Sequence, residues 1–248
     1  RPFIVNGENG YTYGQIAGMA RKVAYVLHED IELVRGARVA VLWENGVEAA
    51  ASLFGILTAG GVMVPLNTEF RGESLAYLLE HSDAEVLVVS AKLLRKVHQV
   101  LPELSHLRAV ITDGELPLHR WNGRSVPAIF SWNENVTAAA ELAEPVRTIY
   151  IDLAAIIYTS GSTGVPKGVM LTHLNLVSNM RAIVEYLHLT ADDSVMVILP
   201  LFYIYGLSLL LTHAMVGGSL VFDNRFMYPN KVLEHMQEAE VTGFAGVP

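Results

Sequence analysis

Apolar residues along the chain alternate between short runs typical of buried strands and longer stretches typical of helices. The run "RVAVLWEN" (38–45) is β-branched and almost continuously apolar, which is typical of a strand buried on both faces. The next stretch, 46–59, is rich in helix formers and stops at Gly60 and Gly61, which suit a left-handed helix cap. Because "VMVP" then resumes a strand pattern, one strand-helix-strand unit is predicted here.

The same alternation recurs along most of the chain. It predicts an α/β architecture with mostly parallel sheets and helical crossovers. The stretch 113–145 is the exception, because it has few periodic apolar positions, and it is interpreted as a long surface connection. Further strands are predicted at 85–89, 108–112, 154–158, 168–173, 194–199, 219–223 and 241–247, and further helices at 91–100, 172–188, within the buried run from 207, and from 229 onward.

Composition narrows the class of protein. The 248 residues contain no cysteine, which excludes disulfides and zinc-thiolate sites and favours the cytoplasm. The net charge of −8, with scattered Lys and Arg, argues against a nucleic-acid partner. The most apolar stretch, 207–222, is short of the ~20 residues that a transmembrane helix needs, so no membrane span is predicted. A hydrophobic fraction of 52% is high and predicts either a large core or apolar surface that meets a partner or further chain and could drive self-association.

The segment "YTSGSTGVPKG" (158–168) follows a predicted buried strand and carries the main candidate chemistry. Its glycines allow backbone N–H groups to turn toward an anion, its hydroxyls add neutral donors, and its lysine adds a positive charge. With many donors and no acidic residue, the segment predicts a polyphosphate site. The candidate phosphate-binding residues are Thr159, Ser160, Gly161, Ser162, Thr163, Gly164 and Lys167.

The spacing of this segment does not fit a Walker A loop. Counted from Gly161, Pro166 stands where the second glycine belongs and Gly168 stands where the magnesium-binding hydroxyl belongs. The residues that follow also favour a strand, so the segment is expected to connect strand to strand. A plain hairpin turn is the simplest alternative, but such a turn needs only two to five residues.

The same segment resembles the phosphate-loop signature of the adenylate-forming enzyme superfamily, which includes acyl-CoA synthetases and 4-coumarate-CoA ligases. The resemblance extends to "LTAGGVMVPLN" (57–67), "LPLFYIYG" (199–206) and "VTGFAGVP" (241–248), in the family's order. It implies ATP-dependent activation of a carboxylic acid to an acyl-adenylate, followed by thioester formation on CoA or on the pantetheine of an acyl-carrier protein. Mg²⁺ would arrive with ATP, and Lys167 would stabilise charge on the departing pyrophosphate.

One position departs from the family pattern. Many relatives have a histidine where this chain has Tyr203, in the segment that gates the carboxylate channel; Tyr205 and Gly206 belong to the same segment. Tyrosine keeps the bulk of a gate but not the protonation of an imidazole. It also lacks the negative charge of the aspartate with which amino-acid-activating relatives bind the substrate ammonium in this neighbourhood. A fatty, aryl or alicyclic acid is therefore expected. Core packing is the alternative interpretation of both tyrosines.

Other candidates are weaker. His173 is best interpreted as a helix-start residue, and the nine histidines show no metal-binding spacing, so no metal ligand is predicted. Residues 1–248 are expected to form the N-terminal part of a large AMP-binding domain, which alone would be inactive, because the family's later adenine, ribose and lysine motifs do not occur. Two alternatives remain: a nucleotide-binding relative without turnover, and a phosphotransferase, for which no acidic magnesium motif is found.

Overall fold

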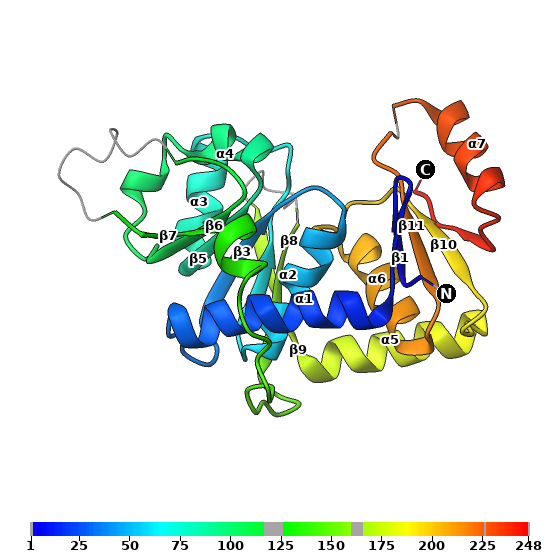
Figure 1. Ribbon diagram of the computed structural model, residues 1–248, viewed down its shortest axis with the longest axis horizontal. Coiled ribbons are helices and arrows are strands. Elements are labelled where there is room, and N and C mark those ends of the chain that lie inside the picture. The colour runs from blue at the N-terminus through cyan, green and yellow to red at the C-terminus, as the bar shows by residue number, and fades with distance from the viewer. Residues whose placement is uncertain (1, 117–125, 160–165, 226, 248) are drawn as a thin grey trace.

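The computed structural model describes residues 2–116, 126–159, 166–225 and 227–247. It contains two β-sheets with helices packed against them, which Figure 1 shows side by side. Nearly all strand pairs are parallel, with one antiparallel strand at an edge of each sheet. The predicted α/β architecture is therefore confirmed.

The larger sheet has seven strands in the order β7-β6-β5-β3-β4-β8-β9. Side chains alternate between its two faces, and both faces of its central strands are buried, which explains the near-continuous apolar runs. Only β9 runs antiparallel, paired with β8. The strands are β3 (Arg38–Leu42), β4 (Val62–Pro65), β5 (Ala84–Val89), β6 (Ala109–Thr112), β7 (Ala128–Ser131), β8 (Leu153–Thr159) and β9 (Lys167–Thr172).

Two pairs of helices cover this sheet. Val39, Val41, Val86 and Val88 face the hydrophobic cluster that contains α1 and α2. The alternate residues of the same strands face a second cluster that contains α3 and α4. The helical segments are α1 (Tyr13–Tyr25), a π-turn η1 (Val26–Asp30), α2 (Val47–Thr58), α3 (Glu73–His81), α4 (Ala91–Val97), a 3-10 turn η2 (Leu101–Glu103) and a π-turn η4 (Trp132–Val136).

The smaller sheet has five strands in the order β12-β10-β11-β1-β2. One face packs with α6 into the same cluster as α1 and α2, whereas α7 covers part of the other face and lies at the far right of Figure 1. Its elements are β1 (Ile4–Asn6), β2 (Asn9–Tyr11), α5 (His173–Leu187), β10 (Ser194–Val197), α6 (Ile204–Val216), β11 (Ser219–Phe222), α7 (Pro229–Glu238) and β12 (Gly243–Phe244).

Most predicted elements occur close to their predicted places. The left-handed cap of α2 is confirmed at Gly60, whose φ is +73°. The predicted helix 91–100 ends earlier, at Val97, and the closing strand is only two residues long. The irregular stretch 113–145 contains an edge strand, β7, and the turn η4. Helices α1 and α3 and strands β1 and β2 were not predicted from the apolar pattern.

Candidate functional site

The carboxyl ends of strands from both sheets meet around one cavity of about 470 Å³, which we call the inter-sheet cavity. In α/β proteins, ligands bind at such strand ends. The seven-stranded sheet contributes residues that follow β3 and β4, and the five-stranded sheet contributes residues in or after β10, β11 and β12. The lining residues are Trp43, Glu44, Asn45, Thr68, Glu69, Ile198, Leu199, Pro200, Phe202, Asn224, Phe244, Gly246 and Val247.

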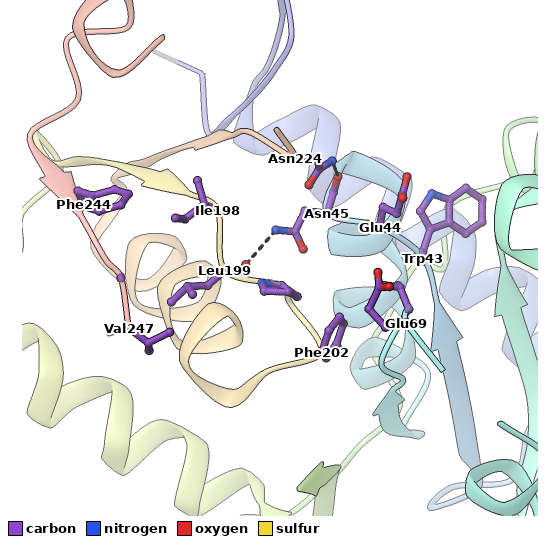
Figure 2. A pocket seen from close by; sticks show the side chains of 13 residues that line it. Trp43, Glu44, Asn45, Glu69, Ile198, Leu199, Phe202, Asn224, Phe244 and Val247 are labelled. Atoms are coloured by element: carbon purple, nitrogen blue, oxygen red, sulfur yellow. Dashed lines mark hydrogen bonds between the residues drawn. The ribbon is translucent and has the colours of Figure 1, made fainter. Parts of the chain in front are cut away.

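The side chain of Asn45 links the two sheets at this cavity (Figure 2). Its Nδ2 donates to the backbone oxygen of Leu199 at 2.9 Å, and its Oδ1 accepts from the backbone N–H of Leu201 at 2.8 Å. Asn224 adds a second link, because its Nδ2 donates to the backbone oxygen of Asn45 at 2.9 Å. Sequence reasoning did not select Asn45, although a polar residue directly after a buried strand was the available signal.

The predicted phosphate loop joins strand to strand, as the sequence indicated, and the structure shows that the two strands are antiparallel. β8 ends at Thr159 and β9 begins at Lys167, and these two residues are cross-strand partners. Both are exposed. Because β8 runs parallel to β4, Thr159 lies at the same edge of the sheet as the residues after β3 and β4. The remaining predicted phosphate ligands, Ser160, Gly161, Ser162, Thr163 and Gly164, lie outside the described residues.

Tyr158 anchors the stem of this loop. Its hydroxyl lies 2.8 Å from Nδ1 of His81 and donates at 3.4 Å to the backbone oxygen of Leu78, both in α3. Burial raises the pKa of the Tyr158 hydroxyl to about 12, so it stays protonated at neutral pH. Gly168 pairs with Tyr158 across the two strands, and a Cβ there would lie 3.4 Å from the tyrosine ring. The stem is thus tied to the helix layer of the sheet.

The predicted gate segment forms the turn into α6. Tyr203 is the residue before the helix; its N–H donates to the oxygen of Pro200 at 3.0 Å, and its side chain is about half exposed. Its neighbour Phe202, which sequence reasoning did not select, lines the inter-sheet cavity instead (Figure 2). Gly206 is required by packing, since a Cβ there would lie 2.2 Å from the oxygen of Pro200.

Tyr205 lines a second cavity of about 570 Å³, which we call the α6 cavity. It lies between α5, α6 and the strands β10 and β12, and its wall is largely apolar. The buried His213 also contacts it, and burial lowers the pKa of that imidazole. The lining residues are Ile183, Tyr186, Leu187, Leu189, Asp193, Val195, Tyr205, Ser208, Leu209, Thr212, His213, Thr242, Gly243, Phe244 and Ala245.

Asp193 is the one carboxylate on that wall, and its oxygens are already engaged. Oδ2 accepts from the N–H of Thr190 at 2.8 Å, and Oδ1 accepts from the hydroxyl of Thr242 at 3.0 Å. The hydrogen bond from the Thr190 backbone is the main reason that the pKa of Asp193 is lowered. These hydrogen bonds hold the turn between Thr190 and β10.

His173 is the first residue of α5, directly after the N-cap residue Thr172, whose side chain accepts from the N–H of Asn175. Burial lowers the pKa of the His173 imidazole. Among the described residues, no group of three or more His, Asp or Glu side chains is placed to hold a metal ion. In the same part of the chain, no helix is both long and apolar enough to cross a bilayer.

Comparison with known proteins identifies the family. The sequence profile of the AMP-binding enzyme family matches residues 1–248, so the chain belongs to the AMP-binding enzyme family. The chain is 30% identical to a 4-coumarate-CoA ligase of Pinus taeda, covering 100% of this chain and 45% of that protein. It is 26% identical to a long-chain-fatty-acid-CoA ligase of Salmonella typhimurium, covering 100% of this chain and 48% of that protein.

A solved structure agrees with this assignment. The ATP-bound structure of MatB from Rhodopseudomonas palustris superposes with a TM-score of 0.84 at 31% identity, covering 99% of this chain and 46% of that one. The chain thus spans about half the length of the relatives it matches.

Proposed function

We propose that the full-length protein containing this chain activates a carboxylic acid with ATP and then forms a thioester on CoA or on a carrier-protein pantetheine. In the first step, a carboxylate oxygen bonds to the α-phosphorus of ATP while the bond to the β-phosphate oxygen breaks, which releases pyrophosphate. In the second step, the thiol sulfur bonds to the acyl carbon, AMP leaves, and the thiol proton passes to solvent.

One observation carries this proposal. Thr159 and Lys167 bracket the family's phosphate signature and are cross-strand partners at the edge of the sheet where ligands bind. An exposed hydroxyl and an exposed ammonium suit the β- and γ-phosphates of ATP, and the charge of Lys167 would offset the charge that develops on pyrophosphate. Ser160, Gly161, Ser162, Thr163 and Gly164 would complete the phosphate contacts. Mg²⁺ would come bound to ATP.

The preferred substrate is a fatty, aryl or alicyclic acid rather than an amino acid. The α6 cavity supports this choice, because Ile183, Leu187 and Leu209 give it an apolar wall beside the gate residue Tyr205. Its carboxylate, Asp193, is engaged by Thr190 and Thr242, and Tyr203 offers no charge for a substrate ammonium. Tyr203 itself would act as a steric gate.

ATP-pyrophosphate exchange by the full-length protein tests the activity. A panel of fatty, aryl, alicyclic and amino acids should give exchange with one of the first three classes. Lys167→Ala should lower the exchange rate by a factor on the order of 10² to 10³, as for loss of one preorganised charge-stabilising donor. Lys231→Ala is the matched control, since Lys231 is an exposed lysine in α7 that pairs with Glu234 at 2.9 Å. Equal rates for the two variants would contradict the role of Lys167.

A nucleotide-binding relative without turnover is the alternative function, and it is compatible with Tyr203 in place of the histidine of many relatives. It would bind ATP in equilibrium measurements yet exchange no pyrophosphate with any acid. The isolated 248-residue chain should also fail to support exchange, because it spans about half of its relatives' length. Robust exchange by that chain alone would contradict this expectation.

A further inference from the structure

Asn45 connects the two sheets through contacts that its own sequence neighbourhood does not reveal. The residue directly follows the strand-end Trp43 and Glu44 and is almost fully buried. Its side chain bonds to Leu199 and Leu201 on either side of Pro200, more than 150 positions away in the sequence. These bonds fix the backbone where the five-stranded sheet leads into the gate segment.

The contact requires an amide. The side chain donates to a carbonyl and accepts from an N–H at the same time, and an asparagine presents both groups side by side. An aspartate of the same shape could accept from Leu201 but would place a carboxylate against the carbonyl of Leu199. An alanine would leave both backbone groups without these partners inside the protein, which is costly for buried polar groups.

The gate segment is held from two sides. Asn45 holds Leu199 and Leu201, while α6 packs so closely that only a glycine fits at 206, against the oxygen of Pro200. The same oxygen accepts from the N–H of Tyr203. The places of Phe202 at the inter-sheet cavity and of Tyr203 at the start of α6 therefore depend on the two bonds from Asn45.

We infer that Asn45 is a positioning residue of the reaction, which sets the gate segment 199–206 relative to Thr159 and Lys167 at the stem of the phosphate loop. The seven-stranded sheet carries both Asn45 and the loop stem at Thr159 and Lys167, whereas the gate segment belongs to the five-stranded sheet. Asn45 is thus a direct hydrogen-bonded link between the sheet that would hold ATP and the segment that would guide the acid. The inference rests on the proposed function, since only acid activation requires the two to meet.

The test uses the full-length protein with Asn45→Asp and Asn45→Ala. We expect each to raise the apparent KM for the acid, and so to lower kcat/KM for the acid, by about tenfold or more in pyrophosphate exchange, because a displaced gate segment no longer holds the acid in place. The apparent KM for ATP should change by less than about threefold, since Thr159 and Lys167, which would contact the phosphates, belong to the seven-stranded sheet and not to the gate segment. Ser52→Ala is the matched control: it removes another buried hydrogen bond, from Ser52 to the oxygen of Glu48 within α2.

A purely structural role would give a different result. It would lower the thermal midpoint and reduce kcat through a smaller folded fraction while leaving the KM for the acid unchanged, and that outcome would overturn the inference. Hydrogen exchange of the backbone supplies a readout independent of activity: Asn45→Asp should increase exchange at 199–207 more than elsewhere.

The two proposals can fail separately. If no acid supports exchange by the wild type, the proposed function fails, and unchanged protection at 199–207 would then overturn the positioning role as well. If the wild type is active while Asn45→Asp retains its acid parameters, only the positioning role is wrong. Should Asn45→Ala fail to fold, the nearly isosteric Asn45→Asp carries the test.

Discussion

The two sheets contain similar parallel strands but differ in how their faces are covered. In the seven-stranded sheet, successive residues of β5 alternate between two large clusters: Val86 and Val88 face α1 and α2, and Leu87 and Val89 face α3 and α4. In the five-stranded sheet, one face joins the main cluster. The other face meets a small cluster in which Met196 and Val221 contact Val232 of α7. Both faces are buried in β10 and β11 as well, but one of them meets only this small cluster instead of a second large one.

Because of this difference in packing, the two parts of the candidate site are held in place by different contacts. The phosphate-loop stem, formed by β8 and the exposed edge strand β9, lies at the edge of the seven-stranded sheet, and Tyr158 ties it to α3. The gate segment follows the five-stranded sheet, and its position is fixed by Asn45 and by the close packing at Gly206. Truncation of a core side chain should thus cost more stability between the large clusters of the seven-stranded sheet than where α7 covers the five-stranded sheet.

The largest expected effect comes from Leu87→Ala in β5. Leu87 is fully buried between α3 and α4, so its truncation leaves a cavity in a layer that has little room to relax. We expect the free energy of unfolding to fall by about 3 kcal/mol. Chemical denaturation checks this, with Leu233→Ala as the same deletion at an exposed position of α7. Similar losses for both variants would contradict the two-sided burial of this sheet.

A smaller effect is expected from an ion cluster that ties α7 to the end of β11. The buried Asp223 accepts from Arg225 and lies 2.8 Å from Nδ1 of His235, and the hydrogen bond from Arg225 is the main reason that its pKa falls from 3.8 to about 2. Because the folded-state pKa is depressed, this stabilisation is present above pH 3.8 and is lost as the pH falls toward 2.

Asp223→Asn should therefore lower the free energy of unfolding by about 1 to 2 kcal/mol at neutral pH, after discounting for the exposed Arg225. It should also flatten the decline in stability between pH 4 and pH 2. Denaturation curves at several pH values, with Lys231→Ala as a control for an exposed pair on the same helix, check both effects. If the free energy of unfolding declined as steeply between pH 4 and pH 2 in the variant as in the wild type, groups other than Asp223 would cause that decline.

The elements that sequence reasoning found were those whose local pattern agrees with their final environment. β3 and β5 are buried on both faces, so their sequences read as continuous apolar runs. β7 was hidden because it is an edge strand with Ala128 and Ile129 exposed. Helix α3 is only nine residues long, and α1 contains two glycines, so neither gave a strong helical signal.

The residues of the candidate site also fall into those that the local sequence predicts and those that it does not. The phosphate segment could be predicted because its donors are contiguous, and the pattern after it predicted a second strand, whereas the pairing of Lys167 with Thr159 came only from the structure. Asn45 could not be predicted as a link, since its partners lie in a distant segment. Which residue of 202 and 203 faces the inter-sheet cavity depends on the turn before α6, and the structure places Phe202 there.

A smaller effect again is expected where α7 covers the five-stranded sheet. Val232 is buried, but it packs in the small cluster with Met196 and Val221. The surrounding side chains can therefore partly fill the space that truncation leaves. We expect Val232→Ala to lower the free energy of unfolding by about 1 kcal/mol. Val34→Ala makes the same deletion at an exposed position and should have almost no effect. A loss as large as that of Leu87→Ala would indicate that this face is as tightly packed as the larger sheet.

The smallest effect concerns His213, which lies on the covered side of the five-stranded sheet. It is almost fully buried, and burial lowers its pKa even though Asp193 favours its charged form. The unfolded chain therefore binds a proton near pH 6.5 that the folded protein does not, and stability should decline as the pH falls below that value. His213→Asn keeps a side-chain nitrogen that can donate to the oxygen of Leu209, as Nδ1 does at 3.0 Å, but it cannot titrate. The free energy of unfolding should therefore fall less steeply between pH 7 and pH 5 in this variant. Equal slopes in variant and wild type would mean that other groups cause the pH dependence. His173 would be the first of these to test, because burial lowers its pKa too.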